Sequence, residues 1–199
     1  MPPRKEEENQ RIRDDRREKI LEAAAKLFAR KGLAATKIAD IAAAADMSHG
    51  LVYHYFSSKE EVFSTLVERA LDGASMVTHG AHLQPGTPWE QLRWMTARML
   101  EGVRQQPEYF QVVLQAMTSD TVPAELREKA LQEGESSRRA MIQLIEAGQK
   151  TGEVVAGDPS QLATLFYSCI QGLALSETFK GPLEMTFPTI DQVMRILEP

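Results

Sequence analysis

Two short stretches of helical periodicity lie between residues 36 and 56, with only about three residues between them. The first stretch places four apolar residues on one helical face, Ile38, Ile41, Ala42 and Ala45. Thr36 is the expected N-cap of the first helix, and Ser48 is the expected N-cap of the second. Two short amphipathic helices joined by so short a turn indicate a helix-turn-helix.

The second of these helices has two unlike faces. At 100° per residue, an arc of about 140° holds His49, Gly50, Tyr53 and His54. The opposite side is mainly apolar and holds Leu51, Val52 and Tyr55. Imidazole and phenol groups hydrogen-bond well to base edges and phosphates, so the polar face suits a DNA major groove. The alternative is that these rings cover a small core as half-buried side chains.

The rest of the chain also has helical periodicity, because no segment alternates convincingly between apolar and polar residues. Nine helices are expected, at about residues 9–30, 36–45, 48–56, 58–80, 88–105, 107–118, 123–150, 160–180 and 189–197. Ser58 and Glu61 have capping-box spacing, and prolines stand near three later helix starts. The sequence therefore predicts an all-α fold. We expect a DNA-binding unit over residues 1–56 and a helical body over residues 57–199.

Charge and composition limit the functions to consider. The net charge is −5, but residues 1–70 carry 13 Lys and Arg against 12 Asp and Glu, so the acidity belongs to the body. The single cysteine, Cys169, permits no intrachain disulfide and no cysteine-rich metal site. No signal peptide or membrane-spanning stretch is evident, so a cytoplasmic protein is expected. His79 and His82 stand at i and i+3, but without a further ligand they predict no metal, and no cofactor is expected.

A long run of residues resembles the N-terminal domain of the tetracycline-repressor (TetR) family of transcriptional regulators. It reads T-K-I-A-D-I-A-A-A-A-D-M-S-H-G-L-V-Y-H-Y-F-S-S-K-E from Thr36, preceded by R-E-K-I-L-E-A-A-A-K-L-F-A-R-K-G from Arg17. The later helices fit the family only in number, length and order. The resemblance implies a homodimer in which three helices bind DNA, a fourth leads to the body, and the last two long helices pair across a four-helix interface.

The resemblance also implies roles for individual residues. Recognition-helix contacts would come from Ser48, His49, Gly50, Tyr53 and His54. Phosphate contacts would come from Thr36, Lys37, Tyr55 and Lys59. Many family members have glycine where this chain has Asp46, and a left-handed backbone there would be tolerable for Asp but less comfortable, so the resemblance does not fix the geometry of the turn. The basic residues Arg4, Lys5, Arg11, Arg13, Arg16 and Arg17 resemble a DNA-binding arm, and a solvated tail is the alternative.

The body offers candidates for a ligand site and for a dimer contact. Flexible methionines and flat aromatic rings would line a cavity for an apolar or aromatic molecule: Met95, Met99, Phe110, Met117, Met141, Phe166 and Tyr167. Simple core packing is the alternative for each of them. Apolar stripes on the last helices suit a dimer contact or an intrachain core, and comprise Leu162, Leu165, Cys169, Ile170, Leu173, Val193, Met194 and Leu197.

These features favour a ligand-responsive transcriptional repressor that is not an enzyme. We expect a homodimer that binds a near-palindromic double-stranded DNA operator and is released by a small apolar or aromatic effector. One alternative is a helical enzyme with His49 or His54 as general base, although no carboxylate or hydroxyl stands at a spacing that would orient either ring. Another is a helical adaptor that binds proteins through its acidic body.

Overall fold

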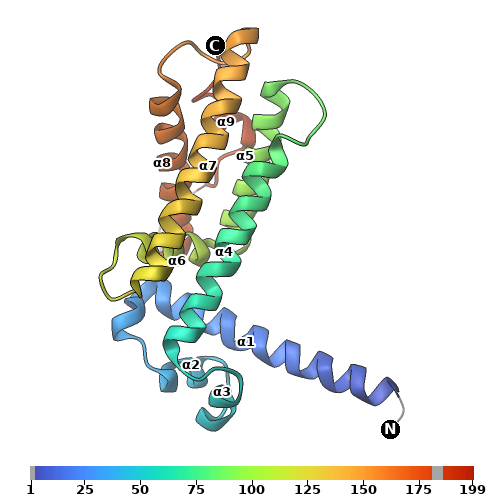
Figure 1. The fold of residues 1–199 in the computed structure, drawn as a ribbon, viewed down its shortest axis with the longest axis vertical. Coiled ribbons are helices and arrows are strands. Elements are labelled where there is room, and N and C mark those ends of the chain that lie inside the picture. The colour runs from blue at the N-terminus through green and yellow to red at the C-terminus, as the bar shows by residue number, and fades with distance from the viewer. Residues whose placement is uncertain (1–2, 181–185) are drawn as a thin grey trace.

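The computed structural model describes residues 3–180 and 186–199. Within these ranges the chain forms nine helices and no strand, which confirms the predicted all-α fold. The helices are α1 (Pro3–Ala35), α2 (Ile38–Ala44), α3 (His49–Tyr55), α4 (Lys59–Ala81), α5 (Pro88–Gln105), α6 (Pro107–Thr118), α7 (Ala124–Thr151), α8 (Pro159–Thr178) and α9 (Ile190–Met194) (Figure 1).

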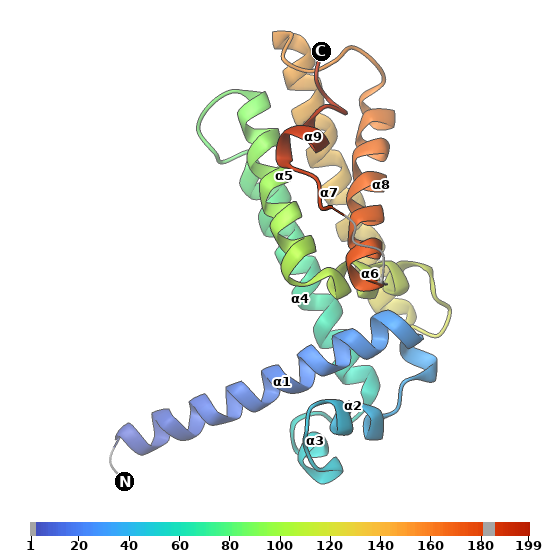
Figure 2. The ribbon, with the colours of Figure 1, turned by 180° about the vertical axis from the view of Figure 1, so that it is seen from behind.

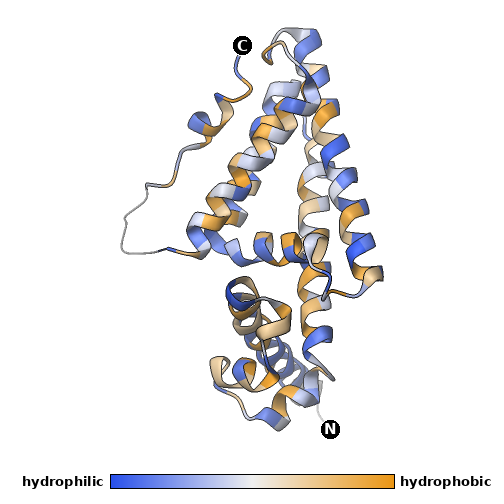
Figure 3. Ribbon diagram, turned by 90° about the vertical axis from the view of Figure 1, so that its left-hand side faces the viewer, coloured by the Kyte–Doolittle hydropathy of each residue, from blue (hydrophilic) through white to orange (hydrophobic). Residues whose placement is uncertain are grey.

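Helices α1, α2 and α3 form one end of an elongated molecule, and α4 rises from that end into the body (Figure 1). In the body, α4, α5, α7 and α8 run along the long axis, while α6 crosses beneath them next to α1 (Figures 1 and 2). Each helix carries both apolar and polar residues, as expected for amphipathic helices that pack their apolar sides on one another (Figure 3). Among the described residues, no helix has an apolar stretch long enough to cross a bilayer.

The first helix is longer than its sequence pattern predicts. It begins at Pro3 rather than near Asn9, and its N-terminal part projects away from the body (Figure 2). A proline suits the first position of a helix, where its missing N–H costs no hydrogen bond. Arg4 and Lys5, two of the predicted arm residues, lie outside the residues whose side chains are described. The helix predicted to end at about residue 30 is interrupted at Gly32, which has φ 78° and ψ 167° within α1.

The core beneath the DNA-binding end draws on helices from both halves of the chain. Phe28 of α1 and Phe63 of α4 meet edge to face with ring centroids 5.2 Å apart. The same buried cluster includes Val112 and Ala116 of α6 and Leu126 of α7. The division of the chain near residue 56 therefore stays a prediction, because the apolar packing continues across it.

Three helix starts, those of α4, α5 and α6, follow the predicted signals. Pro88 and Pro107 are the first residues of α5 and α6, as expected. The Ser58 hydroxyl accepts a hydrogen bond from the Glu61 N–H at 3.1 Å, but the Glu61 carboxylate does not complete the reciprocal bond of a capping box. It accepts instead from the N–H and the hydroxyl of Ser57, at 2.6 and 2.7 Å, which fixes the connection between α3 and α4.

Candidate nucleic-acid interface

Helix α3 is held at its start by a cap and on one side by the core. The Ser48 hydroxyl accepts a hydrogen bond from the Leu51 N–H at 3.2 Å, so the predicted N-cap is confirmed. Val52 is fully buried and Phe56 is 1% exposed, which anchors the apolar side of the helix. The Arg17 guanidinium lies 5.0 Å from the centroid of the Phe56 ring, a cation–π contact that covers the C-terminal end of the helix.

Helix α2 packs through Ile38 and Ile41, which are 7% and 0% exposed. Its N-cap is Lys37, so the prediction that Thr36 caps it is wrong. The Thr36 side chain is fully buried, and its hydroxyl donates to the Gly32 carbonyl at 2.8 Å. That bond closes the end of α1 and turns the hydroxyl away from solvent, so this side chain is not presented to a phosphate.

The turn between α2 and α3 contains a left-handed residue at Asp46, where many family members have glycine. Asp46 has φ +54°, the single positive value among the described residues other than glycine. The following residue, Met47, donates its N–H to the Ala42 carbonyl at 2.9 Å. The left-handed residue reverses the chain within three positions, so the start of α3 lies against the end of α2.

The polar face of α3 is presented to solvent. The residues that the structure leaves exposed on and beside this helix are Ser48, His49, Gly50, Tyr53 and His54. The His49 and Tyr53 rings meet edge to face with centroids 4.9 Å apart, so each restricts the motion of the other. Tyr55 is half-buried, and its ring packs against the core on one side and against His54 on the other. The alternative in which all four rings cover a core is therefore wrong for His49, Tyr53 and His54.

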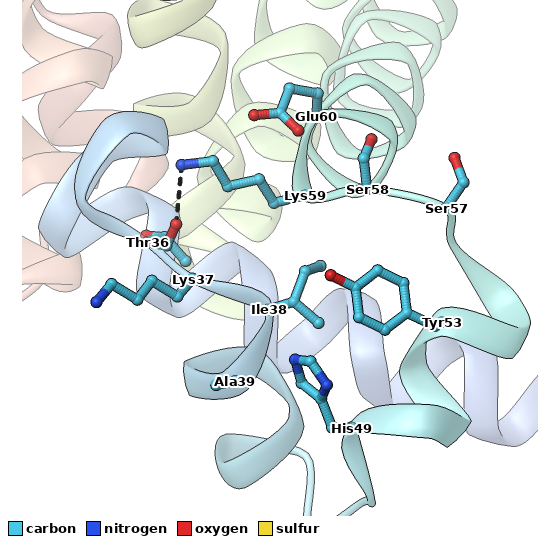
Figure 4. Close-up of a pocket in the computed structure, with 10 residues that line it drawn as sticks. All are labelled: Thr36, Lys37, Ile38, Ala39, His49, Tyr53, Ser57, Ser58, Lys59 and Glu60. Atoms are coloured by element: carbon cyan, nitrogen blue, oxygen red, sulfur yellow. Dashed lines mark hydrogen bonds between the residues drawn. The ribbon is translucent and has the colours of Figure 1, made fainter.

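A shallow hollow of about 400 Å³ lies where α2, α3 and the start of α4 meet (Figure 4). It is lined by Thr36, Lys37, Ile38, Ala39, His49, Tyr53, Ser57, Ser58, Lys59 and Glu60. The Tyr53 hydroxyl and the His49 ring are directed toward α2 across this hollow (Figure 4). The hollow adjoins the N-terminal end of α4, where helix N–H groups and the helix dipole favour an anion.

Lys59 lines the hollow but its ammonium group points inward. Nζ donates to the carbonyls of Leu33, Ala34 and Thr36 at 2.8, 3.1 and 3.0 Å. Figure 4 shows the side chain turned toward Thr36. The ammonium therefore caps the carbonyl end of α1, and the phosphate contact that sequence similarity implies for Lys59 is not available to this rotamer. Lys37, by contrast, is exposed beside it.

Two sequence profiles match the chain. Residues 20–66 match the profile described as bacterial regulatory proteins, tetR family. Residues 85–175 match the profile described as tetracyclin repressor-like, C-terminal domain. The chain belongs to the tetR family of bacterial regulatory proteins. The first profile contains α2 and α3 whole, so the family resemblance covers the exposed histidines and tyrosines.

Individual tetR-family relatives are moderately similar. The chain is 37% identical to the uncharacterized HTH-type transcriptional regulator YfiR of Bacillus subtilis over 93 residues, which cover 46% of this chain and 44% of YfiR. It is 28% identical to the HTH-type transcriptional repressor KstR2 of Mycobacterium tuberculosis over 140 residues, which cover 70% of this chain and 69% of KstR2. The match thus spans less than half of the first relative, and both relatives are regulators rather than enzymes.

Solved structures of the family share the fold. The ketosteroid transcriptional regulator KstR2 of Mycobacterium tuberculosis superposes with a TM-score of 0.71 at 22% identity, covering 92% of this chain and 95% of that one. AibR, solved in complex with isovaleryl coenzyme A and operator DNA, superposes with a TM-score of 0.68 at 20% identity, covering 90% and 94%. At these identities the similarity concerns the fold alone.

In the body of this tetR-family chain, most predicted ligand residues are packed core. Met95, Met141 and Phe166 are fully buried in one apolar cluster, against which Phe110 and Tyr167 pack. The Tyr167 hydroxyl donates to the Ser137 carbonyl at 3.2 Å, and burial raises the pKa of this phenol to about 12. Met99 belongs to the same cluster, whereas Met117 packs against the other core, so the structure does not bring all seven residues together.

Two glutamines of the body stand out because their amide groups lack protein partners. Gln111 of α6 is 6% exposed, and its Nε2 has no hydrogen-bond partner among the described residues. The Nε2 of Gln171 on α8 is likewise buried and unpartnered. A buried donor without an acceptor is costly, so these amides need a water or a ligand oxygen. The helical pattern of α6 gave no sign that Gln111 faces inward.

The predicted dimer residues divide into three groups by their burial. Ile170, Val193, Met194 and Leu197 are at most 3% exposed and belong to the core of a single chain. The prediction that these four form a dimer contact is wrong, because their own chain already buries them. The α9 residues pack back onto α5, where the Thr96 hydroxyl donates to the Met194 sulfur. Leu162, Cys169 and Leu173 are half-buried against the same core. Leu165 is 59% exposed and remains a candidate.

Proposed function

We propose that the chain is a transcriptional repressor that binds double-stranded operator DNA by inserting α3 into the major groove. The observation that carries the proposal is the division of α3 into a buried side anchored by Val52 and an exposed side with His49, Tyr53 and His54. A recognition helix needs this division, because one side must pack on the first helix while the other reaches base edges.

The exposed side chains divide into reading and positioning roles. His49 and His54 hydrogen-bond to base edges, while the Tyr53 hydroxyl, Lys37 and the start of α4 contact phosphates. Ser48 and Gly50 let the helix start approach the DNA closely, since a Cβ on Gly50 would meet no atom within 4 Å. Tyr55 contributes through packing, because its ring is half-buried. Thr36 and Lys59 shape the site through their bonds to α1 and do not contact DNA.

The proposed repressor acts as a homodimer that pairs through α8. Five residues lie on one exposed stripe of this helix, at spacings of three or four: Leu165, Ser168, Gly172, Leu175 and Phe179. Leu165, Leu175 and Phe179 are 59%, 49% and 51% exposed, so this stripe gathers apolar side chains at the surface. Pairing through this stripe would give two copies of α3 related by a two-fold axis, as a near-palindromic operator with half-sites about 34–36 Å apart requires.

The effector of this repressor is a small molecule with an apolar part and an oxygen acceptor. The apolar part suits the methionines and aromatic rings of the body cluster, and the oxygen suits the unpartnered amides of Gln111 and Gln171. Isovaleryl coenzyme A, bound by AibR, has an apolar acyl chain and a carbonyl oxygen of this kind. Ligand binding would shift the population of dimers toward a form whose recognition helices no longer match the operator. A shift from 1:99 to 99:1 needs about 5.5 kcal/mol of differential affinity.

DNA retained by the chain from its own genome would identify the operator and test the proposal. Gel-shift titrations on the retained fragments at two salt concentrations should show saturable, sequence-selective binding that weakens as salt rises. Tyr53→Phe should weaken binding to every sequence alike, whereas His49→Ala should change the preference at one base pair by about 1–3 kcal/mol. Absence of selective binding at both salt concentrations would favour the adaptor or enzyme alternatives.

A further inference from the structure

A second hollow, of about 280 Å³, lies between α4 and α7 in the body. It adjoins the C-terminal end of α4, a helix of 23 residues whose N-terminal end follows α3. The hollow is therefore separate from the proposed DNA interface. Its lining consists of His79 and His82 from α4, and Ser136, Arg139, Ala140 and Gln143 from α7.

The residues around this hollow share one chemical character. The two from α4 stand at i and i+3, and the four from α7 stand at i, i+3, i+4 and i+7, so each helix contributes a single face. Every lining side chain except Ala140 carries a hydrogen-bond donor or an imidazole, and none is a carboxylate. A pocket lined by donors and by no carboxylate favours an anion. It differs in this from the chain as a whole, which has 28 acidic residues against 23 basic ones.

Both imidazole rings are held in place by α4 and α7. His79 Nδ1 lies 3.1 Å from the Ser75 carbonyl oxygen, and its Nε2 lies 3.3 Å from the Ser136 hydroxyl. His82 Nε2 lies 3.1 Å from the Ala140 carbonyl oxygen. Because a carbonyl only accepts, the facing ring nitrogens donate. Three of the four ring nitrogens are thus engaged with protein, which leaves a poor ligand set for a metal ion.

Arg139 carries a positive charge at the hollow and makes no hydrogen bond to its nearest carboxylate. Its Nε lies 3.7 Å from the Glu135 carboxylate, beyond hydrogen-bond distance, and its side chain is 67% exposed. Arg138 donates two hydrogen bonds to the same carboxylate, at 2.8 and 3.0 Å. Arg138, Arg139 and Glu135 together have a net charge of +1. The Arg139 guanidinium also presents a planar set of donors that matches a phosphate or a carboxylate.

We infer that this hollow is a binding site for a small oxyanion, a phosphate or carboxylate group, contacted by Arg139 and Gln143. The volume leaves room for the anionic group together with part of the molecule that carries it. An anion bound there lies against the middle of α7, beside the C-terminal end of α4. The site is thus distinct in place and in chemistry from both the DNA interface and the apolar cluster of the body.

The test is an amide NMR titration of the full chain with sodium phosphate, sodium acetate and sodium chloride at equal ionic strength. Phosphate or acetate should produce saturable shifts at Ser136, Arg139 and Gln143, and the tighter of the two identifies the anion class. Arg139→Gln should weaken that binding by about tenfold or more. Arg98→Gln is the matched control, because Arg98 is also exposed and paired with a carboxylate three residues away, Glu101.

Phosphate is expected to shift α3 and the start of α4 as well, and Arg139→Gln should leave those shifts unchanged. Equal shifts with chloride, or equal affinity at the hollow in Arg139→Gln and the wild type, would overturn the inference. So would Zn²⁺ saturating His79 and His82 while phosphate and acetate leave the hollow unaffected. Gln143→Ala provides a second variant, with a predicted loss of affinity in the same direction, should the arginine variant fold poorly.

Discussion

Replacing Lys59 with methionine should destabilise the fold, because its ammonium closes the end of α1. Nζ donates to the Leu33, Ala34 and Thr36 carbonyls at 2.8–3.1 Å, where one helix ends and the next begins. Carbonyls at a helix end carry partial negative charge, which favours a cation. Methionine keeps much of the apolar stem but offers no donor, so these carbonyls lose a partner.

The size of the effect follows from the number and type of bonds. A hydrogen bond to a charged group contributes about 1.5–3 kcal/mol net. The three bonds share one ammonium and are not additive, so we expect Lys59→Met to cost about 2–3 kcal/mol in total. For a chain of about 200 residues, each kcal/mol lowers Tm by about 2–4 °C, which predicts a decrease of about 4–12 °C.

Lys37→Met is the matched control, because it makes the same chemical change on an exposed side chain nearby. Its Tm should change little, since exposed substitutions usually alter stability by less than about 0.5 kcal/mol. Its operator affinity should fall instead, and the slope of log K against log salt should decrease by about 0.9. Calorimetric melts and gel shifts on both variants separate the two roles. An unchanged Tm in Lys59→Met, together with the smaller salt slope, would refute the structural role of Lys59.

Three further changes test other parts of the structure. Asp46→Gly should raise the free energy of unfolding by about 0.5–1 kcal/mol, because glycine adopts φ +54° without strain; a lower urea midpoint would contradict this. Leu165→Glu on α8 should shift sedimentation from dimer to monomer, whereas Gln105→Glu on α5 should not; a dimeric Leu165 variant would exclude this face. Hydrogen bonds from Ser57 lower the pKa of Glu61, so this carboxylate stabilises the fold at neutral pH and its contribution is lost as the pH falls through that lowered pKa. The Tm difference between wild type and Glu61→Gln should therefore be largest near pH 7 and shrink below about pH 4.5, and a difference independent of pH would argue against it.

Helix boundaries could be predicted where a local signal decides them. Pro88 and Pro107 mark the first residues of α5 and α6, and Ser48 and Ser58 cap α3 and α4 through bonds to N–H groups three positions ahead. Each of these signals acts within one helical turn, and at these four starts the folded chain keeps it. The exposed face of α3 could be predicted for the same reason, because helical geometry alone separates its polar arc from Val52.

Roles that depend on which of several partners a side chain bonds in the folded chain could not be predicted. Thr36 has the composition of an N-cap, yet its hydroxyl bonds back to Gly32, and Lys59 bonds to carbonyls 23–26 residues earlier. The apolar stripe of α9 was equally consistent with a dimer contact and with a core. Its packing on α5, tied by the ion pair between Arg93 and Asp191, decides for the core.

The acidic composition and the DNA-binding end are compatible because the fold separates them in space. The acidic excess lies in residues 71–199, which form most of the body, whereas α2 and α3 lie at the other end of the long axis (Figure 1). At physiological ionic strength, charge interactions between exposed groups are largely screened beyond about 8 Å. The potential that a phosphate meets at α3 therefore depends on nearby groups such as Lys37, His49 and the start of α4. Repulsion between DNA and the acidic body then opposes only those approaches in which the body comes close to DNA. Approaches in which α3 reaches the DNA first are favoured.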